Sequence, residues 1–184
     1  HAVVKTAPLG EVATIERRGL DPASLPSDTR YLRLEHIERG GRIIGSDTVG
    51  RAELASTKFA FTPEHVLYGK LRPNLGKVTR PPFTGVCSTD ILPIRPGPHL
   101  DRDYLAHYLS QPAMIDFAAS RTSGANLPRI SPTVLGTFEI PLPPLDEQRR
   151  IAAVLDHADD LRTKQRSVIA KLDLVEGEDG QVRP

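Results

Sequence analysis

The stretch that most constrains this chain runs from residue 141 to residue 175 and begins Pro-Leu-Pro-Pro-Leu-Asp-Glu-Gln. Its prolines at positions 141, 143 and 144 lack amide donors and favour extended backbone, so a helix cannot begin before Leu145. Asp146 and Glu147 then place carboxylates in the first turn, where the helix dipole stabilises negative charge. Because no glycine or proline follows until Gly177, we expect one uninterrupted helix from about 146 to 175. At 1.5 Å per residue it is roughly 45 Å long.

Apolar residues in this helix recur in alternating steps of three and four, which is the heptad pattern of a coiled coil. The pattern is short, about three and a half heptads. An amphipathic helix docked on its own domain is therefore the alternative to a coiled coil. The seam is formed by Ile151, Val154, Ala158, Leu161, Gln165, Val168, Leu172 and Val175, with Gln165 as the single polar member.

Length and composition limit what the rest of the chain can be. The 184 residues are enough for one domain with a real core plus an appendage. Hydrophobic residues make up 39%, and no apolar run approaches the length of a membrane span. No signal-peptide pattern opens the sequence, and its single cysteine, Cys87, excludes an internal disulfide and a cysteine-based zinc cluster. These features favour a cytoplasmic protein.

Strands are expected at several places in the first 100 residues. Residues 8–15 are predicted to form a short edge element. Residues 31–37 alternate, which predicts a strand with Leu32 and Leu34 on one face and Tyr31, Arg33 and Glu35 on the other. Residues 66–78 predict two strands joined by a turn at Pro73-Asn74. Residues 87–96 predict a further strand that ends at Pro96.

Capping residues indicate three short helices in the second half of the domain. Asp101 is expected to cap the first helix, whose apolar face carries Tyr104, Leu105, Tyr108 and Leu109. Pro112 is expected at the first position of the second, whose Met114, Ile115 and Phe117 are predicted to lie in the core. Ser131, followed by Pro132, is expected to cap the third.

The charge is unevenly distributed although the net charge is only +1. Residues 1–145 carry 17 Lys+Arg and 14 Asp+Glu, whereas residues 146–184 carry 7 and 9. Between positions 58 and 80 five basic residues face one acid, Glu64, and residues 117–138 contain two arginines and no acid. Local basic surfaces of this kind favour phosphate binding, although an ordinary solvated surface is the alternative.

Several catalytic signatures are missing. Arg80-Pro81-Pro82-Phe83 resembles the clamp of adenine methyltransferases, but arginine cannot accept a hydrogen bond from the target amino group. None of the six lysines follows an acid by two residues, as a common metal-dependent nuclease site requires, and no histidine pair is spaced i, i+4. The chain also lacks a Walker loop and a Gly-x-Ser-x-Gly elbow. We therefore expect no catalytic residues, no metal site and no bound cofactor.

Four segments together resemble one known family. They are Pro141–Asp156, Val66–Val78 with its Gly-Lys-Leu-Arg-Pro core, the Cys-Ser-Thr-Asp that begins at Cys87, and Ser123–Ser131. In this order they are similar to motifs of the specificity subunit of type I restriction-modification systems. In that family two long helices pair as an antiparallel coiled coil and hold two DNA-reading domains a fixed distance apart.

The resemblance implies a fold and three regions. The fold is α/β (α+β), with a curved, mostly antiparallel sheet, flanking helices and a long projecting C-terminal coiled-coil helix. Residues 1–143 correspond to a target-recognition domain, residues 144–176 to the conserved-region helix used for dimerisation and spacing, and residues 177–184 to a flexible tail. One domain and one helix correspond to a half-length subunit or an excised half.

The resemblance also implies contacts with double-stranded DNA. Arg72 and Arg129 each adjoin a proline that fixes the backbone, so either could read a base. Alternatively, either pairs with an acid such as Asp90 or Glu139 and holds the junction together. Asp90 itself is predicted to be a structural carboxylate rather than a catalytic acid. The candidate DNA-binding residues are Lys58, Lys70, Arg72, Lys77, Arg80, Arg121 and Arg129.

The implied partners are those of a type I complex. We expect an antiparallel homodimer, a modification (methyltransferase) subunit that docks near the junction and binds S-adenosylmethionine, and a restriction subunit joined through the complex. The alternatives are the recognition part of a fused restriction-methylation enzyme and a coiled-coil scaffold that does not bind DNA. A scaffold has no need of the basic residues between positions 58 and 80.

Overall fold

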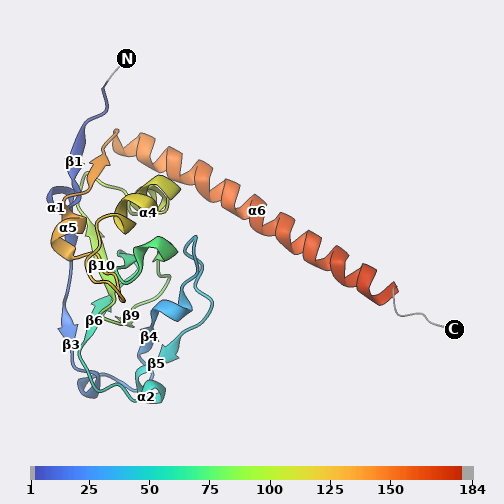
Figure 1. Cartoon of the computed structure of the whole chain (residues 1–184), viewed down its shortest axis with the longest axis horizontal. Helices are drawn as coiled ribbons and strands as arrows, with labels where there is room; N and C mark the ends of the chain where they lie inside the picture. The colour runs from blue at the N-terminus through green and yellow to red at the C-terminus, as the bar shows by residue number, and fades with distance from the viewer. Residues whose placement is uncertain (1–2, 180–184) are drawn as a thin grey trace. The chain divides into compact units, whose positions relative to one another are not determined.

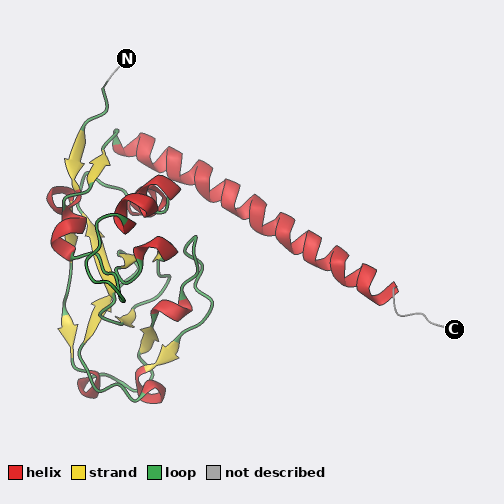
Figure 2. Ribbon diagram, viewed as in Figure 1, coloured by secondary structure: helices red, strands yellow, loops and turns green. Residues whose placement is uncertain are grey.

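The computed structural model describes residues 3–179 of the chain (Figures 1 and 2). Its strands are β1 (Thr6–Pro8), β2 (Ala13–Ile15), β3 (Gly19–Leu20), β4 (Arg30–Leu32), β5 (Asp47–Thr48), β6 (Lys58–Phe61), β7 (Val66–Gly69), β8 (Val78–Thr79), β9 (Gly85–Cys87), β10 (Ile91–Pro96) and β11 (Glu139–Pro141). Its α-helices are α1 (Leu9–Val12), α2 (Val49–Ala52), α3 (Arg102–Leu109), α4 (Pro112–Ala119), α5 (Pro132–Gly136) and α6 (Leu145–Asp179). Three 3-10 helices complete the set: η1 (Pro22–Ser24), η2 (Leu34–His36) and η3 (Pro73–Leu75).

The strands form three sheets rather than one. A five-stranded sheet has the order β3-β6-β9-β4-β5, a four-stranded sheet has the order β2-β10-β7-β8, and β1 pairs with β11. Among these strands only β4 and β9 run parallel, and every other pair is antiparallel. The predicted α/β class with mostly antiparallel pairing is confirmed.

A hydrophobic cluster joins the two larger sheets. It is built from buried side chains of β4, β6 and β9 in one sheet and β7 and β10 in the other, together with Ile37. Burial of such side chains removes apolar surface from water, which is the main favourable contribution to folding. The cluster consists of Leu32, Ile37, Phe61, Leu67, Cys87 and Ile91.

Three strand predictions were wrong in their extent. Strand β4 ends at Leu32, and η2 replaces the rest of the predicted strand over residues 31–37. The predicted faces are confirmed at the start of this segment: Leu32 and Leu34 pack in one cluster and Tyr31 in another, and Tyr31 and Leu32 are both buried. The segment 87–96 turns at Ser88–Asp90 and contributes to two sheets, and the segment 8–15 contains the single helical turn α1 between β1 and β2.

The helix starts follow the predicted caps. The Asp101 carboxylate accepts from the backbone N–H of Tyr104 at 3.0 Å, and the Ser131 hydroxyl oxygen accepts from Val134 N–H at 3.1 Å. Pro112 and Pro132 occupy the first turns of α4 and α5, where the missing amide proton costs nothing. Phe117 departs from the prediction, because it is 38% exposed rather than in the core.

Helix α6 is continuous from Leu145 to Asp179, without a break at Gln165. The chain divides into two compact units after Arg149, so the first turn of α6 belongs to the first unit. The predicted tail begins within α6, and its residues 180–184 lie outside the described part. In residues 3–179 no helix is both long and apolar enough to cross a membrane.

Gln148 ties the first turn of α6 to the rest of the first unit. Its side chain is fully buried and uses both ends of its amide. The amide nitrogen donates to His99 O at 2.9 Å and Pro143 O at 2.8 Å, while the amide oxygen accepts from Asp101 N–H at 2.8 Å. These bonds join the proline-rich junction to the start of α3, and the sequence motif gave no sign of that partner.

Candidate nucleic-acid interface

The β7–η3–β8 hairpin carries three of the predicted DNA-binding residues. Arg72 is exposed at the start of η3, and Lys70 is half-buried after β7. Lys77 is also half-buried, and its ammonium donates to Leu34 O at 2.7 Å. Lys77 therefore holds η2 against the hairpin, in addition to any role at the surface.

Two left-handed residues shape the tip of this hairpin. Gly76 has φ 62°, and a Cβ there would lie 2.8 Å from Ile115 Cδ1, so glycine is favoured at this position. Arg72 has φ 50° and ψ 64°, a conformation that costs a residue with a side chain about 1–2 kcal/mol. The following residue, Pro73, disfavours that conformation further.

The loop 123–129 lies directly beside the hairpin. Its ends pair through two backbone hydrogen bonds between Ser123 and Arg129, each 2.9 Å long. Arg72 N–H donates to Pro128 O at 2.8 Å, and Ile130 N–H donates to Lys70 O at 3.0 Å. The structure thus joins two basic motifs that are far apart in the sequence.

Asp90 is the acid at this meeting point. Its carboxylate pairs with the Arg129 guanidinium at 3.2 Å, and its carbonyl oxygen accepts from Lys70 N–H at 2.9 Å. The alternative role predicted for Arg129, an ion pair with Asp90, is therefore observed. The pair also supports the interpretation of Asp90 as a structural carboxylate. Since Arg129 balances Asp90, the charges of Lys70 and Arg72 remain uncompensated within this group.

Two predicted DNA-binding residues lie outside this group. Lys58 is only 7% exposed, and its ammonium donates to Ser56 Oγ at 2.7 Å and lies 5.9 Å from the centre of the Tyr31 ring. In this conformation it cannot reach a phosphate, because the fold has buried it in the five-stranded sheet. Arg80 forms an ion pair with Asp103 of α3 at 3.3 Å.

Arg121 follows α4 and stacks on an aromatic ring. Its guanidinium carbon lies 4.6 Å from the centre of the Phe117 ring, and that ring packs on Phe138 at 5.0 Å. This contact explains why Phe117 can remain partly exposed: one face packs on the core and another carries an arginine. Helix α4 also packs against η3.

Sequence reasoning missed Arg39. This exposed residue precedes the Gly40-Gly41 turn, and its guanidinium donates to Asn74 O at the hairpin tip at 3.3 Å. The sequence shows only an arginine beside a two-glycine turn. It gives no indication that this turn lies beside η3. Arg39 adds another cation to the surface around Arg72.

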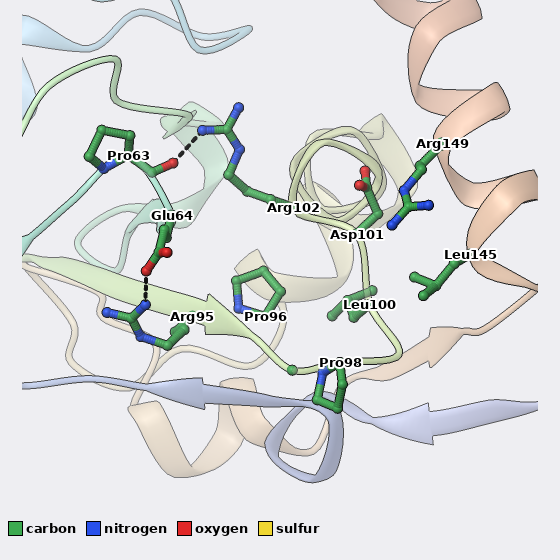
Figure 3. Close-up of a pocket in the computed structure, with 11 residues that line it drawn as sticks. Pro63, Glu64, Arg95, Pro96, Pro98, Leu100, Asp101, Arg102, Leu145 and Arg149 are labelled. Atoms are coloured by element: carbon green, nitrogen blue, oxygen red, sulfur yellow. Dashed lines mark hydrogen bonds and ion pairs between the residues drawn. The ribbon is translucent and has the colours of Figure 1, made fainter.

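A separate surface pocket lies between β10, α3 and the first turn of α6 (Figure 3). Its charged groups are largely paired. Arg95 bonds to Glu64 and, at 2.5 Å, to Glu16, while Arg102 donates to Pro63 O. The hydrogen bond from Arg95 lowers the pKa of Glu16 below its ordinary value, with a smaller contribution from His65. Because these pairs satisfy one another, most of the charge that lines the pocket is compensated.

Comparisons with known proteins agree with the resemblance. The model of the family described as "Type I restriction modification DNA specificity domain" matches residues 3–171. The specificity subunit of the Escherichia coli type I restriction enzyme EcoDI is 30% identical over 167 residues, which are 88% of this chain and 37% of that subunit. The chain thus spans well under half the length of this relative.

Solved structures show the same fold. The HsdS subunit from Thermoanaerobacter tengcongensis matches with a TM-score of 0.75 at 24% identity, over 91% of this chain and 45% of that one. The S subunit of a type I restriction-modification system from M. genitalium matches with a TM-score of 0.61 at 16% identity, over 95% and 44%.

The fold and its loop-borne cations define this chain as an α/β module with a basic loop surface and a long C-terminal helix. It belongs to the family of type I restriction-modification DNA specificity domains.

Proposed function

We propose that this chain recognises double-stranded DNA, reads one half of a bipartite target, and pairs through α6 with a second copy that reads the other half. The observation that carries the proposal is the junction of the 70–77 hairpin with the 123–129 loop. There Arg129 neutralises the local acid and leaves Lys70 and Arg72 for an outside anion. Basic residues on loops that a rigid sheet supports are the usual means of reaching phosphates and base edges.

Duplex binding tests the DNA-recognition part. The full chain is expected to retain random-sequence duplex at low salt, and Lys70→Glu with Arg72→Glu is expected to abolish that binding. Arg17→Glu with Arg18→Glu is the matched control, since it makes the same charge change at two exposed arginines far from the hairpin in sequence. Equal loss in both double variants would mean that only total charge matters, and the interface would be refuted. A wild-type chain without duplex affinity would favour the scaffold alternative.

The pairing part rests on the seam of α6. Every apolar side chain of the seam except the small Ala158 is at least 37% exposed. A row of exposed apolar side chains favours association with another surface. In an antiparallel pair one register places all eight seam positions opposite another seam position. That register sets Ile151 against Val175, Val154 against Leu172, Ala158 against Val168 and Leu161 against Gln165 of the second copy.

Cysteine crosslinking tests this register, because Cys87, the natural cysteine, is buried. A chain with both Ala158→Cys and Val168→Cys is expected to form covalent dimers on mild oxidation. Either change alone is expected to form few, since each new thiol would then face an apolar side chain. Efficient crosslinking of Val168→Cys alone would indicate a parallel pair and contradict the proposal.

The remaining partners follow from the same proposal. A methyltransferase subunit docks near the 141–149 junction and binds S-adenosylmethionine, and a restriction subunit joins through the complex, in the cytoplasm. This chain supplies recognition and no catalytic group. Genome-wide mapping of methylated sites in cells with and without the chain tests this, and an unchanged pattern would count against it.

A further inference from the structure

Arg72 stands out within the hairpin because it combines a backbone conformation that favours glycine with a long cationic side chain. Both residues that flank η3, Arg72 and Gly76, adopt the left-handed conformation. At Gly76 the chain uses the residue that this conformation favours, whereas at Arg72 it keeps a long cationic side chain directly before a proline. A strained residue of this kind persists only where the surrounding structure holds it.

The neighbouring loop supplies that hold. The Arg72 N–H donates to Pro128 O at 2.8 Å, and the loop carrying Pro128 is closed by the paired backbone bonds of Ser123 and Arg129. The Arg129–Asp90 ion pair fixes the same loop from its other side. Contacts of the Arg72 backbone and of the neighbouring loop therefore hold Arg72 in place, and its own guanidinium takes no part in them.

The guanidinium of Arg72, by contrast, contributes nothing visible to the fold. Among residues 3–179 it forms no hydrogen bond, ion pair or ring contact, and the residue is exposed. The nearby acid, Asp90, is already paired with Arg129. Glu53 is the other residue with a side chain and a positive φ in the described part, but it caps the C-terminus of α2, where the left-handed conformation is common.

We propose that Arg72 is a phosphate anchor: it binds the DNA backbone without regard to sequence, and the chain accepts local strain to hold it there. This inference rests on the proposed function, because it needs the domain to bind a duplex. Arg72 stands at a tip shared with Lys70 and Arg39, an arrangement that fits a run of phosphates better than one base edge.

Arg72→Gly relieves the backbone strain and also removes the cation. Stability and duplex affinity are therefore expected to respond differently. The variant is expected to keep the unfolding midpoint of the wild type or to exceed it. Its affinity for duplex is expected to fall about fivefold at 0.15 M salt, with the salt slope reduced by about one, as the loss of one phosphate contact requires. The loss is expected to be equal for a random-sequence duplex and for a duplex that the wild-type chain selects from a random library.

Two further variants make the outcome decisive. Glu53→Gly gives similar backbone relief away from the hairpin and is expected to leave affinity unchanged. Arg72→Lys keeps the cation and is expected to retain most of the salt slope. A loss confined to the selected duplex, or a changed selected sequence, would show that Arg72 reads a base. A lowered unfolding midpoint with unchanged affinity would show a structural role. If the wild-type chain binds neither duplex, the proposed function itself fails, and that result is distinct from a failure of Arg72 alone.

Discussion

Charged substitutions in the seam of α6 give the most direct measurement of self-association. Leu161 and Val168 are 52% and 56% exposed, so the proposed pairing would bury about half of each side chain. Complete burial of such a side chain contributes about 1.5–3 kcal/mol, and half of it about 0.8–1.5 kcal/mol. A symmetric pair contains four of these side chains, for a total of about 3–6 kcal/mol.

Replacing both residues by aspartate removes that contribution. Since 1.4 kcal/mol corresponds to a tenfold change, the dissociation constant is expected to rise by about 10² to 10⁴. Sedimentation equilibrium of the full chain at a series of concentrations measures it. The expected result is a monomer at concentrations where the wild type is a dimer.

Ser167→Asp with Ala170→Asp is the matched control. It adds the same charge to the same part of the helix at exposed positions outside the seam. It is expected to leave the dimer nearly intact. Equal dissociation by both double variants would point to charge repulsion, and an unchanged assembly in Leu161→Asp with Val168→Asp would refute the seam.

Three further outcomes are expected. Lys70→Ala is expected to weaken duplex binding and to lower the salt slope by about one, without lowering stability. Lys77→Ala also loses the bond to Leu34 O, so it is expected to lower the unfolding free energy by about 1 kcal/mol in urea titrations. Gln148→Ala removes hydrogen bonds from three backbone groups, of which Pro143 O is buried, and is expected to cost about 2–4 kcal/mol in the same assay. A cost under about 0.5 kcal/mol would contradict the tie between the junction and α3. Burial, aided by the Arg33 charge, lowers the pKa of His36 in the folded chain. The contribution of His36 to stability is therefore full above its unfolded-state pKa of about 6.5 and is lost as pH falls below that value. Unfolding free energy is expected to decrease from pH 7 to pH 5.5 less steeply in His36→Gln than in the wild type, and identical slopes would refute this role.

The sequence by itself determined the local features of this protein. Three prolines set the start of α6 at Leu145, and the absence of glycine and proline carried it past Val175 without interruption. Asp101 and Ser131 cap helices where the sequence predicted. These results depend on interactions within a few residues, namely missing amide protons, side-chain caps and turn preferences, and the sequence records them directly.

Tertiary structure decided what each side chain meets. The two faces of β4 pack into separate hydrophobic clusters, so Tyr31 is buried as well as Leu32, which the alternating pattern alone did not determine. Lys58 was predicted at a DNA surface, and the five-stranded sheet buries it. Conversely, the bond from Arg72 N–H to Pro128 O joins two motifs into one basic surface. Such contacts depend on which distant segments become neighbours, and no local pattern in the chain encodes that choice.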